Sequence, residues 1–340
     1  MNIYSLAFLL LLFPFCIACN RATEFPPASH QPDSVQSQKR DKAVAPLIVF
    51  KSTDDGQTWQ DISEGLPAAV KDTYNVFRNV FFADANGLYL TDGHGLYHNK
   101  PNATAPFWTK ENFPDEHASI TPGKTGIIAY NFDGHFLQKL NGTSVWSPIF
   151  TNLQEKRVRT FFETAGGTIF IGSDKGLFKS TNSGKTWKQI NAGGWAYRMV
   201  ESKGVLMAAV RDGIIRSTDD GENWDLVMSE VRVNFGVERI KDGFAAITDN
   251  PASKTKSVRT SYDGGKTWQS IDPGLPDDRG IASFIEVGEN FFCSDPKGIY
   301  RSSDKGKTWK LLLLPSFDDK VFNLSVSGNV IYAMPRKRGC

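Results

Sequence analysis

The sequence is poor in the residues that build most disulfide and metal sites. It has four cysteines in 340 residues, and only Cys293 and Cys340 lie outside the first 19 residues, so a disulfide framework is excluded. The five histidines show no metal-ligand spacing. A glycine-rich phosphate loop, an HExxH motif and a GxSxG motif are also absent. We therefore expect no metal and no cofactor.

An excess of charge of one sign is also missing. Lys and Arg number 39 against 37 acidic residues, so no global field attracts nucleic acid or an anionic membrane. We expect no nucleic-acid partner. Any partner selected by charge has to bind a local patch.

The hydrophobic run at the N-terminus is too short and too early for a stable membrane span. Residues 1–19 predict an export signal. The segment CIAC, Cys16 to Cys19, resembles the lipobox of bacterial lipoproteins, which implies lipidation of Cys19. The alternative is an ordinary secretory signal that leaves the protein unanchored.

The segment that follows the signal lacks apolar residues. Residues 20–45 are polar and rich in Pro, Ser and Gln, and cannot bury enough apolar surface to fold. We interpret them as a flexible linker, so the folded domain is expected over residues 46–340.

That region contains a repeated phrase, Ser-x-Asp-x-Gly-x-Thr-Trp. It occurs as KSTDDGQTW from Lys51, KSTNSGKTW from Lys179, RSTDDGENW from Arg216, TSYDGGKTW from Thr260 and RSSDKGKTW from Arg301. Two further units, ending near Trp108 and Trp146, retain the tryptophan without the turn. The seven tryptophans are then spaced by 49, 38, 41, 37, 44 and 41 residues, which is the period of a propeller blade, about 40 to 50 residues.

Each unit alternates apolar runs with Gly or Asp turns in the order expected of four antiparallel strands. The first unit, from Leu47, has only the last two strands, and the missing pair is at the other end of the chain, from Val321. The sequence therefore predicts an all-β, seven-bladed β-propeller closed by pairing of the N- and C-terminal strands. We expect a monomer.

The repeated phrase resembles the Asp-box, or BNR repeat, of sialidase-like and sortilin-like β-propellers. Its Asp and Gly suit a hairpin turn, and its Trp suits packing between blades. We therefore assign it a structural role. The residues concerned are Asp54, Asn182, Asp219, Asp263, Asp304, Trp59, Trp187, Trp224, Trp268 and Trp309.

Ligand-binding residues are sought on the opposite side of the ring, in the turns between second and third strands and in the loops between blades. The turns supply Asp92, Asp133, Asp174, Asp212, Asp249 and Asp295, with His94 and His135 on neighbouring blades. The inner strands begin near Arg78, Arg157, Arg159, Trp195, Tyr197, Arg198, Arg232, Asn234 and Arg279. A cationic and aromatic cluster suits an anionic glycan or protein segment. The alternative is that many of these arginines bridge blades by pairing with the turn aspartates.

Two functions follow from these residues. The first is an exported, membrane-tethered, non-catalytic propeller that binds a protein or glycan through this face, as the resemblance to Asp-box propellers of photosystem assembly factors and sortilin-type receptors implies. The second is a glycoside hydrolase, exo-sialidase-like or active on another polysaccharide. We favour binding because the short units leave little room for a catalytic cleft, and no residue stands out as catalytic.

Overall fold

The computed structural model describes residues 49–67, 81–91, 95–115, 117–229, 236–250, 255–275, 280–313 and 320–337. Within these ranges the chain forms 28 strands in seven four-stranded antiparallel sheets. The same ranges contain no helix that is long and apolar enough to cross a membrane. The all-β, seven-bladed propeller expected from the sequence is therefore confirmed.

Six blades are continuous in the chain. Blade I comprises β3 (Phe81–Asp84), β4 (Gly87–Thr91), β5 (Leu96–Asn99) and β6 (Thr109–Glu111). Blade II comprises β7 (Ser119–Gly123), β8 (Gly126–Tyr130), β9 (Phe136–Leu140) and β10 (Trp146–Pro148). Blade III comprises β11 (Val158–Glu163), β12 (Ile169–Ser173), β13 (Gly176–Ser180) and β14 (Lys188–Asn191). Blade IV comprises β15 (Ala196–Ser202), β16 (Val205–Val210), β17 (Gly213–Ser217) and β18 (Asp225–Met228). Blade V comprises β19 (Gly236–Ile240), β20 (Gly243–Asn250), β21 (Thr255–Ser261) and β22 (Gln269–Ser270). Blade VI comprises β23 (Ser283–Val287), β24 (Asn290–Asp295), β25 (Gly298–Ser302) and β26 (Lys310–Leu313).

Blade VII joins the two ends of the described chain. Its strands are β27 (Lys320–Ser327), β28 (Val330–Lys337), β1 (Phe50–Ser52) and β2 (Gln60–Asp61), in the order β2-β1-β28-β27. Strand β1 pairs with β28 through Phe50↔Ala333, Lys51↔Tyr332 and Ser52↔Ile331. The closure expected from the two incomplete units is confirmed.

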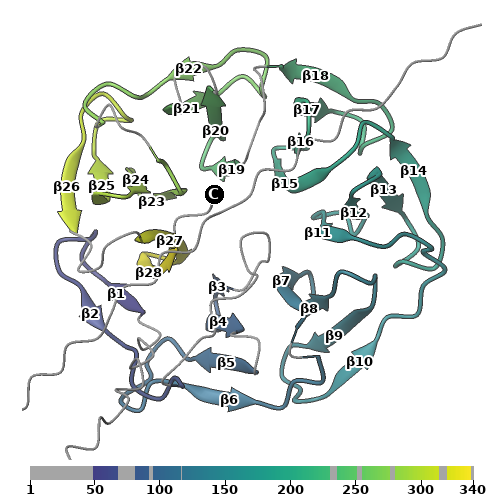
Figure 1. Ribbon diagram of the computed structural model, residues 1–340, viewed down its shortest axis with the longest axis horizontal. Helices are drawn as coiled ribbons and strands as arrows, with labels where there is room; N and C mark the ends of the chain where they lie inside the picture. The colour runs from purple at the N-terminus through teal and green to yellow at the C-terminus, as the bar shows by residue number, and fades with distance from the viewer. Residues whose placement is uncertain are drawn as a thin grey trace, which may run out of the picture. The chain divides into compact units, whose positions relative to one another are not determined.

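The strands are arranged radially around the ring axis. In Figure 1 the first strand of each blade lies nearest the axis and the fourth lies on the rim. Each inner strand contacts the next one around the whole circle, from β3 through β7, β11, β15, β19 and β23 to β27 and back to β3. Because every blade has two neighbours, the second strands β4, β8 and β12 are buried along their whole length, whereas the rim strands β2 and β22 are exposed.

The hydrophobic core lies between the blades. The buried apolar residues form seven clusters, and each cluster combines side chains of two neighbouring blades. Between blades III and IV, for example, Phe170 meets Trp224 edge to face, with ring centroids 6.3 Å apart. Each blade thus depends on its neighbours for burial of its apolar residues.

The repeated turn connects the third and fourth strands of five blades. In its first copy the backbone amide of Gly56 donates to Ser52 Oγ at 2.9 Å, and the amide of Thr58 donates to Asp54 Oδ1 at 2.9 Å. The Trp59 indole N–H donates to the Gly56 carbonyl at 3.0 Å. The glycine has φ of 77°, a conformation that residues with a Cβ rarely adopt. The aspartate therefore shapes the turn, as expected.

Three of the other copies repeat all three bonds, whereas in the last copy the Trp309 indole N–H donates to the Ile271 carbonyl at 3.0 Å. Asn182 replaces the acid in one copy, and its Oδ1 still accepts the Thr186 amide at 2.9 Å. Hydrogen bonds from Thr58 and Ser52 lower the pKa of Asp54 to about 2. Equivalent bonds lower the pKa of Asp219 and Asp304 to about 2, and lower that of Asp263 as well.

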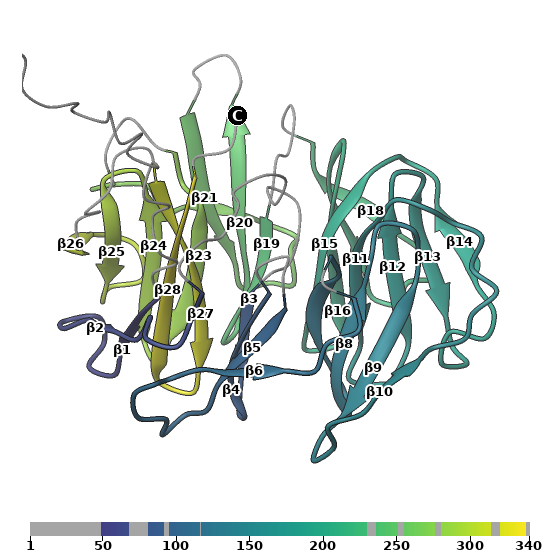
Figure 2. The same cartoon turned by 60° about the horizontal axis from the view of Figure 1, so that its bottom comes forward.

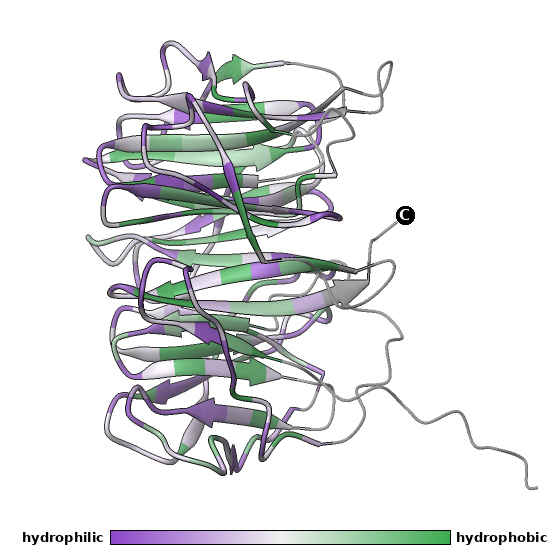
Figure 3. Ribbon diagram, turned by 90° about the vertical axis from the view of Figure 1, so that its left-hand side faces the viewer, coloured by the Kyte–Doolittle hydropathy of each residue, from purple (hydrophilic) through white to green (hydrophobic). Residues whose placement is uncertain are grey.

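The antiparallel order gives the ring two different faces. Turns between first and second strands and the repeated turns lie on one side, here called the motif face. Turns between second and third strands and the connections between blades lie on the other, the loop face. Figure 2 shows the strands running between these two sides, and Figure 3 shows hydrophobic stretches along the strands with hydrophilic residues at many turns.

Candidate functional site

Part of the expected site lies outside the described residues. This holds for Arg78, Asp92, His94, Arg232, Asn234 and Arg279, and for Cys19 as the lipidation residue. The remaining candidates are described below.

A compact group on the loop face of blades III and IV contains several of the expected residues. We call Arg157, Arg159, Asp174, Trp195 and Tyr197 the Trp195 cluster. The guanidinium carbon of Arg159 lies 4.5 Å from the ring centroid of Trp195 and 5.7 Å from that of Tyr197. The two aromatic rings are nearly perpendicular, with centroids 6.0 Å apart. The Trp195 side chain is 42 % exposed, so the cluster presents an indole that is supported from within.

The strand ends position this cluster. Arg159 belongs to inner strand β11, and Asp174 occupies the turn between β12 and β13. Trp195 ends the connection from blade III to β15, where its carbonyl accepts the Arg211 amide at 2.8 Å. Arg157 precedes β11 with φ of 63°, and its amide donates to the Phe132 carbonyl at 2.6 Å. The cluster thus rests on regular strands and on backbone hydrogen bonds.

The charge of the two arginines in the cluster is partly compensated by one aspartate. Asp174 accepts a hydrogen bond from Arg159 Nε and pairs with Arg157 Nη1 at 3.2 Å. The Arg159 and Asp174 side chains are only 12 % and 13 % exposed. Burial raises the pKa of Tyr197, so this phenol is neutral at physiological pH. Arg157 and Arg159 therefore pair with a turn aspartate, but within blade III and not across a blade boundary.

Other candidates on the loop face also have partners. Arg211 pairs with Asp212 at 3.0 Å, and Asp295 accepts the amides of Lys297 and Gly298 at 2.7 and 3.1 Å. Asp212 and Asp295 therefore lie in local turn contacts.

Arg198 pairs across the boundary between blades IV and V. Its Nη2 lies 2.6 Å from Glu238 Oε2 on β19. Burial raises the pKa of Glu238, although Arg198 acts in the opposite direction. Glu238 was not among the expected site residues, because nothing in its immediate sequence distinguishes it from a strand residue facing water.

His135 is exposed and lies in a polar turn of blade II. Its Nδ1 is 3.2 Å from the Asn131 amide nitrogen, and that nitrogen donates to Asp115 at 2.9 Å. In the part of the chain that the structure describes, no group of three or more His, Cys, Asp or Glu residues could hold a metal ion.

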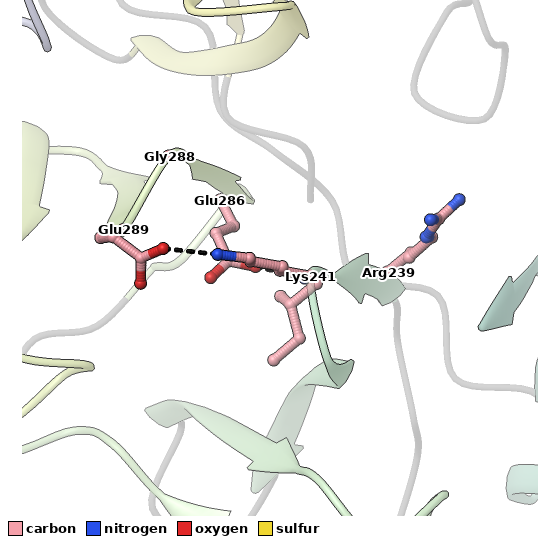
Figure 4. A pocket seen from close by; sticks show the side chains of 6 residues that line it. Arg239, Lys241, Glu286, Gly288 and Glu289 are labelled. Atoms are coloured by element: carbon pink, nitrogen blue, oxygen red, sulfur yellow. Dashed lines mark hydrogen bonds and ion pairs between the residues drawn. The ribbon is translucent and has the colours of Figure 1, made fainter. Parts of the chain in front are cut away.

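The motif face contains two pockets that the sequence did not indicate. One has a volume of about 500 Å³ and lies between the turns of blades III and IV, with Arg239 at its edge. The other, about 400 Å³, lies between the turns of blades V and VI and is also lined by Arg239. Figure 4 shows the second pocket, where Lys241 pairs with Glu289 at 2.6 Å and the guanidinium of Arg239 points away from that pair.

Glutamates near these pockets fasten blades together. Glu163, Glu201 and Glu286 each accept the backbone amide of a turn in the preceding blade. A sequence signal exists, because each glutamate is followed within one or two residues by a hairpin turn at the end of an inner strand.

Comparison with known proteins gives one curated relative of low identity. No protein-family model matches the chain. A protein of Neosartorya fischeri, described as a "probable oligoxyloglucan-reducing end-specific xyloglucanase", is 24 % identical over 297 residues. The match covers 82 % of this chain but 33 % of the relative, so the chain spans about a third of the relative's length.

Solved structures resemble the fold. The extracellular domain of a two-component system from B. thetaiotaomicron matches with a TM-score of 0.57 and 11 % identity, over 76 % of this chain and 37 % of that one. A structure described as YCF48 bound to D1 peptide matches with a TM-score of 0.51 and 14 % identity, over 76 % of this chain and 94 % of that one. At these identities the likeness shows the β-propeller fold alone.

Proposed function

We propose that the protein is an exported, non-catalytic β-propeller that binds a glycan on its loop face, with Trp195 as the anchor. The observation that carries the proposal is the exposed indole of Trp195, fixed against Arg159 and Tyr197. An aromatic ring that is ordered before binding offers a large contact area at small entropic cost. The apolar face of a sugar ring can pack on such a surface.

Polar groups of the same cluster can orient a bound sugar. Arg157 is 67 % exposed and uses Nη1 to pair with Asp174, so its remaining N–H groups can donate to sugar hydroxyls. The guanidinium groups of Arg157 and Arg159 share the single carboxylate of Asp174, so the cluster keeps one net positive charge and can orient a neutral or an anionic glycan. The description of the curated relative names a xyloglucanase, which makes xyloglucan the first glycan to test.

Export and tethering belong to the same proposal. The signal-like residues 1–19 support export, and one of the similar folds is an extracellular domain. The Asp-box family resemblance of the repeated turn and the lipid on Cys19 are part of this proposal too. Metabolic labelling with palmitate, compared between the natural chain and Cys19→Ser, tests the anchor.

The glycan proposal is tested by calorimetric titration of the purified protein with xyloglucan oligosaccharides. We expect Trp195→Ala to weaken binding at least about tenfold, which corresponds to about 1.4 kcal/mol. Tyr262→Ala is the matched control, since this tyrosine is also exposed (50 %) but belongs to the repeated turn on the motif face. Equal affinities of the natural chain and Trp195→Ala would contradict the proposal.

The alternative is a glycoside hydrolase, which the description of the curated relative favours. A glycosidase needs a carboxylic acid whose pKa is raised and a second carboxylate. Glu238 has the raised pKa, caused by burial, but its carboxylate is bound by Arg198. Mass spectrometry of oligosaccharides incubated with the protein separates the two functions. Cleavage that is lost in Glu238→Gln would establish the hydrolase and overturn the non-catalytic proposal.

A further inference from the structure

Three blade boundaries share one contact on the motif face. Glu163 Oε2 accepts the Lys124 amide at 2.8 Å, and Glu201 Oε2 accepts the Ala165 amide at 2.9 Å. Glu286 Oε2 accepts the Lys241 amide. Each donor lies in the turn between the first and second strands of the preceding blade, where Lys124 and Lys241 are the first residues and Ala165 is the second. We call this contact the glutamate clasp.

The clasping glutamates occupy one register position. They pair with Ile169, Leu206 and Phe291 on the second strand. Glu201 and Glu286 lie one pair before the last strand pair, and Glu163 lies one residue before the Thr164 amide that closes its turn on the Thr168 carbonyl. The equivalent residues of blades I, II and VII are Ala83, Pro122 and Val326. These three side chains carry neither an acceptor nor a charge.

Blade V differs from all the others at this position. Arg239, paired with Phe244, stands where the clasp would place a glutamate. The turn that it faces, in blade IV, begins at Lys203, and within the described residues the Lys203 amide has no hydrogen-bond acceptor. The exposed Arg239 side chain likewise has no ion pair within the described ranges. Within the described residues, a backbone donor whose counterpart is bonded at the three clasps therefore coincides with a guanidinium that forms no ion pair.

The two groups line the same pocket. Lys203, Gly204 and Arg239 line this pocket of about 500 Å³ together with Phe162 and Val200. Lys203 Nζ pairs with Asp242 at 2.9 Å, whereas the Lys203 backbone amide and the Arg239 guanidinium remain as donors. In Figure 4 the Arg239 guanidinium also points away from the Lys241 and Glu289 side chains of the next blade.

We propose that this pocket binds an acidic side chain of a partner polypeptide, whose carboxylate takes the place of the missing clasp between the Lys203 amide and the Arg239 guanidinium. The ligand chemistry follows from the molecule itself, because the occupant at three other boundaries is a glutamate carboxylate. A carboxylate bound by a guanidinium and a backbone N–H is a charge-assisted arrangement. The site is on the motif face, opposite the Trp195 cluster.

The surroundings select against densely charged ligands. Glu163 and Glu201 also line the pocket, and each uses one carboxylate oxygen in its own clasp. Their charges repel a polyphosphate or a run of acidic residues, whereas one carboxylate can sit beside Arg239. The expected partner segment therefore carries an isolated Glu or Asp.

The test is a nuclear magnetic resonance titration of the full chain that follows the Lys203 amide. The probe is a short capped peptide with one central glutamate among glycine and serine, and the control peptide has glutamine instead. We expect a saturable downfield shift of the Lys203 amide with the glutamate peptide and none with the glutamine peptide. In Arg239→Ala the affinity should fall at least tenfold, whereas Trp195→Ala should bind the peptide as the natural chain does.

A second variant checks the geometry without any ligand. Arg239→Glu should restore the clasp, move the Lys203 amide downfield in the absence of peptide, raise the melting temperature and abolish peptide binding. The proposal is overturned if the glutamate peptide leaves the Lys203 amide unmoved, if Arg239→Ala binds it unchanged, or if Lys203 in Arg239→Glu resembles the natural chain. Loss of the shift in Trp195→Ala would place the binding on the loop face and also overturn it.

Discussion

Closure of the ring can be tested with a pair of phenylalanines at equivalent positions. Phe292 on β24 is fully buried between blades VI and VII, and Phe170 on β12 is fully buried between blades III and IV. Each ring lies against the glycine of the repeated turn in the next blade, Gly56 and Gly221 respectively. Phe292 differs in one respect, because the turn that it contacts comes from the N-terminal end of the described chain.

We expect Phe292→Ala and Phe170→Ala to destabilise the protein equally. Removing about 150 Å² of buried apolar area at about 25 cal/mol per Å² costs about 4 kcal/mol. Measured Phe→Ala costs in protein cores, about 3–5 kcal/mol, agree with that figure. For a chain of this size each kcal/mol lowers the melting temperature by about 2 °C, so both variants should melt roughly 6–10 °C below the natural protein.

Differential scanning calorimetry of the two variants measures the effect. If β1 and β2 did not complete blade VII, Phe292 would lose its contact with the turn at Gly56 and would keep only the side chains of β27 and β28. Its replacement would then cost less, whereas Phe170→Ala would keep its full cost. A Phe292→Ala loss below half of the Phe170→Ala loss would therefore refute closure by β1 and β28.

Three further predictions concern the repeated turn and the strand contacts. Hydrogen bonds in the repeated turn lower the pKa from 3.8 to about 2 for three aspartates, Asp54, Asp219 and Asp304. These carboxylates therefore stabilise the folded chain fully above pH 3.8, and this stabilisation is lost as the pH falls toward 2. Urea unfolding across this range should show the loss, and Asp219→Asn, which copies the natural Asn182, should reduce it; an unchanged pH slope would contradict the assignment. Gly176→Ala should prevent normal folding because a Cβ there would lie 1.9 Å from the Asn191 carbonyl oxygen. Gly204→Ala has free space and should cost only the strain of its positive φ, about 1–2 kcal/mol. Thermal melts followed by circular dichroism compare the two variants, and equal losses of stability would contradict the close contact at Gly176. Trp108→Phe should lower the free energy of unfolding, measured with urea, by about 1–3 kcal/mol, because the indole N–H donates to the Ile62 carbonyl at 2.6 Å in a buried contact between blades VII and I. Trp59→Phe is the comparison, since that indole bonds within its own turn. A loss in Trp108→Phe no greater than that in Trp59→Phe would contradict the prediction.

The fold could be predicted because its determinants repeat along the sequence. Trp108 and Trp146 occur at blade spacing even though their turns have lost the Ser and Asp, and both pack at a blade boundary like the other tryptophans. The missing strands of the first unit were found at the other end of the chain because a propeller must close to bury its edges. Spacing and alternation are properties of the sequence alone, so no three-dimensional information was needed.

The partners of individual side chains could not be predicted in this way. Asp174 pairs with both Arg157 and Arg159, whereas Arg198 pairs with Glu238 on the next blade. Which carboxylate an arginine reaches depends on strand register and on the angle between blades, which the motif spacing does not specify. The glutamate clasps were not predicted for the same reason: the hairpin turn after Glu163, Glu201 and Glu286 marks their position in the sequence, but the amide that each one accepts belongs to another blade.

In a protein of seven similar blades, a residue that recurs at one position is explained by the blade itself. The aspartates of the repeated turn and the clasping glutamates are of this kind, because each makes the same contact wherever it occurs. Function has to be sought where one blade departs from the rest without a structural compensation. Trp195 is exposed where a loop between blades needs no indole, and Arg239 replaces an acceptor with a donor at a position where apolar residues suffice in other blades. Both departures leave polar or aromatic groups accessible, one on each face, and these are the groups on which the two binding proposals rest.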